Sequence, residues 1–256
     1  MSDYVIPNLS NACRILRLLV DTGKGLSRDE IADLINIPRS STYRILQTLV
    51  TENFVEHRKR RYHPGAGLYT LGMQLSSVDR LRPLCRPVLH SLSQITGFTA
   101  HIAIPSGYQV LLLEVCDSPN LLRVASRAGA VAPIHVAATG KIFLSYLFAD
   151  DLETIANEIG FARFTDRTLT SVEEVHKEIN ATLKRGYGMD EREYNDDVRC
   201  LATPLFDASG TVIAAIGVTS PISQFPKSDI QEVAKTVKEH ALRCYKLLKG
   251  EEVGAV

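Results

Sequence analysis

The sequence contains no long apolar run and no secretion signal. No segment approaches the roughly 18 consecutive apolar residues that a transmembrane helix requires. The first residues, Met1-Ser2-Asp3-Tyr4, are not a basic region followed by an apolar stretch. We therefore expect a cytoplasmic protein without membrane association.

Paired cysteines are also lacking. The chain has five cysteines, an odd number, and no CxxC pair; they are Cys13, Cys85, Cys116, Cys200 and Cys244. Their wide spacing argues against a disulfide framework and against a zinc knuckle. It is typical of a protein in the reducing cytosol.

Net charge is absent as well, because 29 Lys and Arg balance 29 Asp and Glu. The balance conceals an asymmetry: residues 1–70 contain ten basic and seven acidic residues, so the remainder contains 19 and 22. Such opposed charges of +3 and −3 indicate a nucleic-acid-binding part beside another part. With 256 residues, 45% of them hydrophobic, the chain can form one large or two unequal domains.

Two helices are predicted near the N-terminus. Between residues 8 and 21, apolar residues recur at spacings of three and four, which predicts one buried helical stripe of Leu9, Ala12, Ile15, Leu16 and Leu19. Two glycines then end this helix. Ser27 and Glu30 have the spacing of a capping box, so a second helix is expected to begin at Arg28 and to bury Ile31, Leu34 and Ile35.

A third helix, predicted over residues 38–52, separates an apolar face from a polar one. The expected buried stripe contains Thr42, Ile45, Leu46, Leu49 and Val50. The polar side carries residue types that bind base edges and phosphates when a helix enters the major groove. Our candidate DNA contacts on this helix are Arg39, Ser40, Ser41, Tyr43, Arg44 and Gln47. A solvated polar face is the simpler alternative, since most amphipathic helices have one.

A basic segment after the third helix favours the DNA-binding interpretation. Strands are expected over residues 54–58 and 68–71, and the connecting segment includes the four consecutive cations Arg58, Lys59, Arg60 and Arg61. Such a run is often only a solvated loop. Behind a three-helix unit it takes the position of a wing, whose cations lie along the DNA backbone or minor groove.

Several motifs resemble those of the IclR family of bacterial transcription regulators, over nearly the whole chain. They are residues 37–49 (IPRSSTYRILQTL), 69–72 (YTLG), 138–141 (ATGK), 185–193 (RGYGMDERE) and 198–207 (VRCLATPLFD). Their number and order make the resemblance specific. It implies a helical linker after the wing, a GAF-like α/β effector-binding domain, and homodimers or homotetramers on palindromic double-stranded DNA operators.

The resemblance and the residue pattern together predict three segments. Residues 1–72 are expected to form a winged helix-turn-helix, residues 73–80 a linker helix, and residues 81–256 an effector-binding and oligomerisation domain. Pro83 and Pro87 are expected to break or restart the linker helix where the second domain begins.

Strand and helix patterns alternate in the C-terminal part. Runs of β-branched and aliphatic residues predict strands over residues 98–104, 109–115 and 121–126 and a hairpin over residues 201–207 and 211–219. Helical periodicity is present over residues 137–148, 149–158, 172–185 and 227–248. Hairpins with flanking helices indicate an α+β domain with a mainly antiparallel sheet.

Catalytic and cofactor motifs are missing. Gly140-Lys141 resembles the end of a phosphate-binding loop, but His135 replaces the required earlier glycine and Ile142 replaces the magnesium-binding hydroxyl residue. Nucleophile-elbow, zinc-helix and dinucleotide patterns are absent. Three histidines are too dispersed to predict a metal site and are expected to be hydrogen-bonded or on the surface: His101, His135 and His176. We expect no enzymatic activity, no cofactor and no metal.

Small-molecule binding has more support. A helix that begins at Ala138 and Thr139 leaves room and presents unpaired N–H groups, which favour a carboxylate or another acceptor. The resemblance implies that this helix start faces the effector together with Leu121, Val124, Asp190, Val198, Cys200, Gly217 and Thr219. These residues suit a mostly apolar cleft, although each also fits an ordinary core or turn position. Gly217 departs from the family pattern, in which a hydroxyl residue can hold a ligand carboxylate, so a less carboxylate-like, larger or aromatic effector is expected.

The sequence therefore predicts a transcription repressor or activator of a metabolic, catabolic operon, controlled by a carboxylate or aromatic metabolite. The effector is expected to change how an oligomer spaces its wings. Two alternatives stay open: a DNA-binding and oligomerisation protein without a ligand, and an enzyme with an accessory DNA-binding module.

Overall fold

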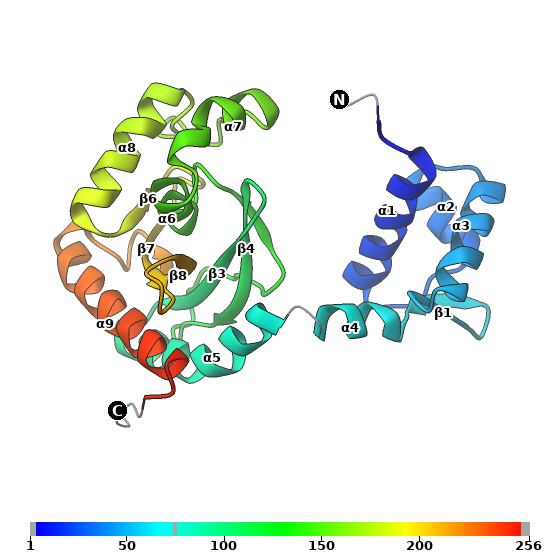
Figure 1. Cartoon of the computed structure of the whole chain (residues 1–256), viewed down its shortest axis with the longest axis horizontal. Helices are drawn as coiled ribbons and strands as arrows, with labels where there is room; N and C mark the ends of the chain where they lie inside the picture. Colours follow the sequence, from blue (N-terminus) through cyan, green and yellow to red (C-terminus); the bar gives the residue numbers. More distant parts are fainter. Residues whose placement is uncertain (1–3, 74–75, 252–256) are drawn as a thin grey trace. The chain divides into compact units, whose positions relative to one another are not determined.

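The computed structural model describes residues 4–73 and 76–251, which form two compact units, one ending at Asp79 and one beginning at Arg80 (Figure 1). The elements of the N-terminal unit are α1 (Pro7–Thr22), α2 (Arg28–Ile35), α3 (Arg39–Thr51), β1 (Val55–Arg58), β2 (Arg61–Pro64) and α4 (Ala66–Met73). Among the described residues, no helix is both long enough and apolar enough to span a bilayer.

The three predicted N-terminal helices pack around one apolar core. Ile15 of α1, Ile31 of α2 and Leu46 of α3 are all fully buried. The capping box at the start of α2 is confirmed, because the Ser27 hydroxyl accepts from Glu30 N at 3.2 Å and the Glu30 carboxylate accepts from Ser27 N at 2.7 Å. These contacts fix where the second helix begins.

The expectation that Leu9 and Leu34 are buried in this core is wrong. Leu9 and Leu34 are each 61% exposed. Both have the correct helical spacing, but the core between three short helices covers a narrower stripe than the apolar periodicity suggests.

The wing is shorter than predicted. β1 and β2 pair over their full length and are joined by a two-residue turn at Lys59 and Arg60, whose φ angles are 50° and 60°. A turn of this kind matches the twist of a hairpin. Tyr62 is buried, stacks on His57, and exchanges backbone hydrogen bonds with Leu26. These contacts hold β2 against the three-helix unit directly after the turn.

The strand predicted over residues 68–71 is wrong, because these residues lie in α4. A four-residue apolar run does not by itself distinguish a strand from a helix. The backbone N–H groups of Gly65 and Gly67 donate to Phe54 O and Asn53 O, which folds the chain back as the helix begins. Glycine is required at position 65, since a Cβ there would lie 2.4 Å from Asn53 O.

The expected helix break at Pro83 and Pro87 is also wrong, since both lie inside α5 (Ser76–Thr96). Each proline removes one helical hydrogen bond. Cys85, Leu89 and Leu92 on the same helix are fully buried, and this packing maintains the helix. Of the predicted linker, residues 74 and 75 lie outside the described part of the chain.

The C-terminal unit is built on a six-stranded antiparallel sheet with strand order β5-β4-β3-β8-β7-β6. The strands are β3 (Thr99–Ser106), β4 (Gln109–Cys116), β5 (Val131–Pro133), β6 (Gly188–Glu191), β7 (Val198–Phe206) and β8 (Val212–Pro221). The helical elements after α5 are α6 (Ala138–Tyr146), η1 (Ala149–Asp151), α7 (Leu152–Glu158), α8 (Val172–Arg185), η2 (Lys227–Asp229) and α9 (Ile230–Leu248). The predicted α+β class with an antiparallel sheet is confirmed.

The strand predicted over residues 121–126 is wrong. These residues form an irregular segment, which side chains hold in place instead of a strand ladder. The Thr99 hydroxyl donates to Val124 O, and the Gln224 side chain donates to Leu122 O, each at 3.0 Å. The edge strand beside β4 is β5.

Helices cover both faces of the sheet (Figure 1). Residues of α5 and α9 form one apolar core against one face, and residues of α6, α7 and α8 form a second core against the other. The side chains of neighbouring strands that point toward α6 are therefore brought together beside the start of that helix.

Candidate functional site

The polar side of α3 is open to solvent. Arg39, Ser40, Tyr43, Arg44 and Gln47 are exposed and Ser41 is half-buried. On the opposite side Thr42, Ile45, Leu46 and Leu49 are buried. Arg14, which the sequence analysis did not identify, donates from Nη2 to Ile35 O at 2.8 Å and so anchors the turn before α3.

The basic residues of this unit differ in their contacts. Lys59 and Arg60 are exposed at the turn of the wing. Arg61 instead donates to Gly25 O at 2.6 Å and forms an ion pair with Glu30 at 3.1 Å, which ties the wing to the start of α2. The four cations of the predicted wing are therefore not equivalent.

A cavity of about 440 Å³ lies beside the start of α6 in the C-terminal unit. It brings together seven of the nine predicted effector residues: Val124, Ala138, Thr139, Asp190, Val198, Cys200 and Thr219. Apolar side chains such as Val110, Leu112 and Val131 form much of the remaining wall. An apolar wall with a few polar groups is the usual form of a small-molecule site.

Two predicted effector residues do not line this cavity. The side chain of Leu121 is fully exposed, because its segment is not a strand. Gly217 lies on β8, where a Cβ would be 2.7 Å from Leu201 O and 3.0 Å from Nε2 of His101. Close packing thus explains why no hydroxyl side chain stands at position 217, and the imidazole of His101 lies next to that position.

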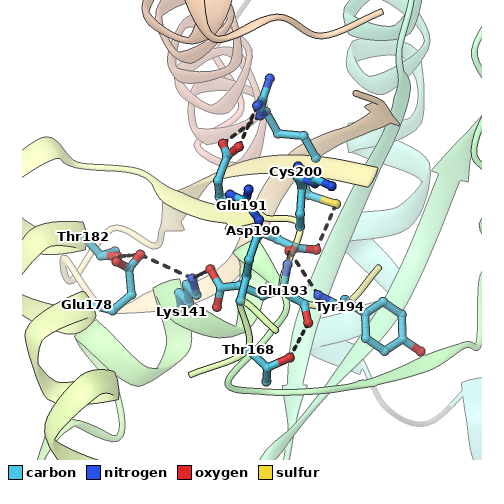
Figure 2. Close-up of polar contacts among 12 residues, drawn as sticks. Lys141, Thr168, Glu178, Thr182, Asp190, Glu191, Glu193, Tyr194 and Cys200 are labelled. Carbon is cyan, nitrogen blue, oxygen red and sulfur yellow. Dashed lines mark hydrogen bonds and ion pairs between the residues drawn. The ribbon is translucent and has the colours of Figure 1, made fainter. Parts of the chain in front are cut away.

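The polar wall of the cavity is a row across neighbouring strands. Strand register places Asp190 beside Cys200, and Cys200 beside Thr219. The Cys200 thiol hydrogen-bonds to the Thr219 hydroxyl. The same thiol lies 3.7 Å from Asp190 Oδ2 (Figure 2). The sequence alone gave no register, so this row became visible only in the folded sheet.

Asp190 is almost completely buried. Its Oδ1 accepts from Glu193 N at 2.7 Å and from Tyr194 N at 3.3 Å. Burial raises the pKa of Asp190 to about 6, although these hydrogen bonds and the Lys141 charge act to lower it. Burial also raises the pKa of the Cys200 thiol well above its usual value. The thiol bonds to Thr219 and Asp190, and its raised pKa favours the protonated form, which is a poor nucleophile.

The start of α6 forms the other polar wall. Ala137 precedes the helix and supplies no side-chain cap, so the first N–H groups can bind an acceptor. Gly188 of β6 lies directly below, and a Cβ there would be 2.2 Å from Ala138 O. Gly188, the second glycine of the motif RGYGMDERE, therefore allows the start of α6 to rest on the sheet.

A buried cluster of charges lies behind Asp190. The Lys141 side chain is 3% exposed and forms ion pairs with Glu193 and, at 3.5 Å, with Glu178 (Figure 2). Glu178 also binds Arg185. Burial raises the pKa of Glu193 to about 7, against the opposing effect of Lys141. In the sequence Lys141 stands only in an incomplete phosphate-loop motif, whereas in the structure it is the centre of this cluster.

Histidines in this unit have different environments. His135 Nε2 lies 3.0 Å from Ala162 O, as expected of a hydrogen-bonded histidine. The same expectation is wrong for His101, whose buried Nδ1 has no partner among the described residues. Over residues 4–73 and 76–251, no group of three or more His, Cys, Asp or Glu side chains is arranged to hold a metal ion.

Sequence comparisons agree with both units. The family model described as "IclR helix-turn-helix domain" matches residues 8–59, and the one described as "Bacterial transcriptional regulator IclR C-terminal" matches residues 73–244. The chain is similar to the "Transcriptional repressor IclR" of Escherichia coli K12, with 26% identity over 93% of this chain and 89% of that protein. It is also similar to the "HTH-type transcriptional regulator KdgR" of the same strain, with 29% identity over 88% and 87%.

Solved structures share the fold. The crystal structure of Thermotoga maritima IclR has a TM-score of 0.72 and 25% identity, covering 94% of this chain and 98% of that one. An IclR homologue from Microbacterium hydrocarbonoxydans, solved in complex with 4-hydroxybenzoate, has a TM-score of 0.80 and 19% identity, covering 95% and 100%. Because the two IclR family models together match most of this chain, the protein belongs to the IclR family of bacterial transcriptional regulators.

Proposed function

We propose that this chain represses or activates transcription of a catabolic operon in response to a small molecule bound in the C-terminal cavity. The observation that carries the proposal is the pairing, in one chain of this family, of an exposed polar helix with a cavity lined by a polar row. The names of the two E. coli relatives, a transcriptional repressor and a transcriptional regulator, support it.

On the DNA side, residues 1–72 bind a palindromic operator. α3 enters the major groove, where Arg39 and Arg44 contact base edges, and Lys59 and Arg60 bind the DNA backbone. Residues 73–80 link this domain to residues 81–256, which also mediate assembly into a homodimer or homotetramer in the cytoplasm.

On the effector side, the cavity of about 440 Å³ holds a small carboxylate or aromatic metabolite. The uncapped start of α6 offers N–H groups to an acceptor, and the 4-hydroxybenzoate complex of a protein with the same fold supports this ligand class. Binding changes the spacing of the wings in the oligomer. Such coupling between sites is typically worth about 1–3 kcal/mol, or roughly 5- to 150-fold in DNA affinity.

Two measurements on the full-length protein test this function. Selection from random duplex DNA should enrich a palindromic sequence, and failure to enrich any duplex at low salt contradicts the DNA-binding part. Titration of metabolites into the complex with the selected duplex should then change its affinity. A metabolite collection that changes neither DNA affinity nor thermal midpoint contradicts the sensing part.

A further inference from the structure

His101 lies in the cavity wall without a hydrogen-bonding neighbour. It is on β3, and strand register places Val115 of β4 and Gly217 of β8 on either side of it. Neither of these residues has a polar side chain. The imidazole is only 6% exposed, and its Nδ1 is buried without a partner among the described residues.

Other buried histidines in this unit do have partners. His135 Nε2 lies 3.0 Å from Ala162 O, and His240 Nδ1 lies 2.7 Å from Thr236 O. A buried polar group without a hydrogen bond costs about 1–3 kcal/mol, and native proteins pair nearly all such groups. His101 differs from the other two because it lines the cavity. Its Nδ1 is enclosed by protein, so Nε2, which lies beside Gly217, is the nitrogen that a molecule in the cavity can reach.

The environment also determines the charge of the imidazole. Burial lowers the pKa of His101 to about 4, so the ring is neutral near pH 7. One nitrogen of a neutral imidazole donates a hydrogen bond and the other accepts one.

The residues on the β8 side of His101 have small side chains, so a ligand can approach the imidazole ring. Gly217 has no side chain, and a Cβ at this position would lie 3.0 Å from Nε2 of His101. The next residue across the sheet is Ala202 of β7, which is also small. The two small residues leave the ring edge accessible along the sheet surface.

We propose that His101 is a specificity-determining residue of this cavity and that its imidazole hydrogen-bonds to an uncharged polar group of the effector, such as a hydroxyl or an amide. The inference rests on the proposed function, because it takes the cavity to be the effector site. A carboxylate on the same effector binds at the start of α6, which rests on Gly188 of β6, three strands away from His101 of β3. His101 then selects among carboxylates by their second polar group.

Phenol and toluene are a matched pair of probes for this hydrogen bond, because they have nearly the same size and only phenol has a hydroxyl. NMR titration of the full-length protein gives a dissociation constant for each. In the wild type, phenol should bind about tenfold more tightly than toluene, as expected for one hydrogen bond to a buried group. His101→Phe should reduce this ratio to near one, while His101→Gln, which can still hydrogen-bond, should keep part of it.

Controls separate this role from a structural one. His176→Phe, on the exposed side of α8, should keep the wild-type ratio. If His101→Phe does not fold, His101→Leu gives the same test. A wild type that does not distinguish phenol from toluene, including one that binds neither, overturns the inference, as does a His101→Phe variant with an unchanged ratio. Benzoate binding that depends on His101 more than phenol binding does also overturns it.

The proposed function can fail or hold independently. If a carboxylate that also bears a hydroxyl releases operator DNA equally well from the wild type and from His101→Phe, the regulator function stands and the role of His101 is overturned. If the protein binds neither DNA nor metabolites while the phenol preference depends on His101, the regulator function is overturned and the hydrogen-bonding role of His101 stands.

Discussion

In the N-terminal unit the candidate functional charges lie at the surface, whereas in the C-terminal unit several charges are enclosed. Arg44, Lys59 and Arg60 are exposed. Lys141 and Glu193, behind the cavity, have side chains that are 3% and 8% exposed. A DNA duplex is too large to be enclosed by a domain of this size, so the residues that bind it must lie on the surface. A small molecule can instead be enclosed in a cavity.

The difference has energetic consequences. Exposed charges contribute little to the free energy of folding, so a substitution at such a residue can change binding without changing stability. Buried charges lose hydration and are tolerated only with close partners. Substitutions of the first kind should therefore change binding, and those of the second kind should change stability.

The largest effect is expected from Lys141→Met. This change leaves the Glu193 carboxylate without a cation in the protein interior, while Glu178 keeps its ion pair with Arg185. Removing one partner of a buried ion pair typically costs about 3–5 kcal/mol of unfolding free energy, measurable by urea denaturation. Lys177→Met is the matched control, because its ion pair with Glu173 is exposed, and it should leave the urea midpoint unchanged. Equal effects of the two changes would remove the distinction between buried and exposed charges.

The pH dependence of stability should sharpen the comparison. Burial raises the pKa of Glu193 from 4.5 to about 7, so its contribution to stability is fully present below pH 4.5 and is lost as the pH rises through 7. Asp190 acts in the same direction, while His101, whose pKa is lowered to about 4, contributes stability above pH 6.5 that is lost as the pH falls.

Glu193→Gln should isolate the first contribution. The stability of the variant, relative to wild type, should improve by up to about 3 kcal/mol as the pH rises from 4.5 to 8. Urea denaturation at several pH values measures this difference. A difference that does not change with pH would show that folding leaves the pKa of Glu193 unchanged.

Arg44→Ala should change DNA binding without changing stability. Loss of a base-edge contact is expected to cost about 1–3 kcal/mol of operator affinity and to relax sequence preference. Fluorescence anisotropy with the operator and with a scrambled duplex measures both. An equal loss on both duplexes would assign Arg44 to the phosphates instead.

The smallest effect is expected in the wing. Lys59→Ala should weaken binding to all duplexes and reduce the slope of log affinity against log salt by about one. Arg61→Ala should reduce this slope less, because Arg61 is already held by Gly25 and Glu30. Salt titrations of both variants make the comparison, and identical slopes would show that Arg61 leaves its protein partners to bind DNA.

Sequence reasoning was most accurate where the signal was local. The capping box of Ser27 and Glu30 and the two-sided pattern of α3 depend on residues within one or two turns of each other. It failed at α4 and at residues 121–126, where short apolar runs suit more than one conformation. Pro83 and Pro87 misled it because packing of α5 on the sheet outweighs the loss of two backbone hydrogen bonds.

The candidate cavity shows the same limit. The resemblance named seven lining residues, but it also named Leu121, which is fully exposed, and Gly217, which packs beside His101. His101 itself gave no signal, since its neighbours in the chain are those of an ordinary strand. Its unpartnered ring depends on strands β4 and β8, which are distant in sequence.

The amino-acid sequence by itself determined the helices of the N-terminal unit, the α+β character of the C-terminal unit and the family, because these follow from periodicity, caps and contiguous motifs. Only the tertiary structure decided which side chains share a wall of the cavity and which charges are buried behind it. The physical reason is that strand register and burial are set by contacts between distant segments, and these contacts determine hydrogen-bond partners and pKa values.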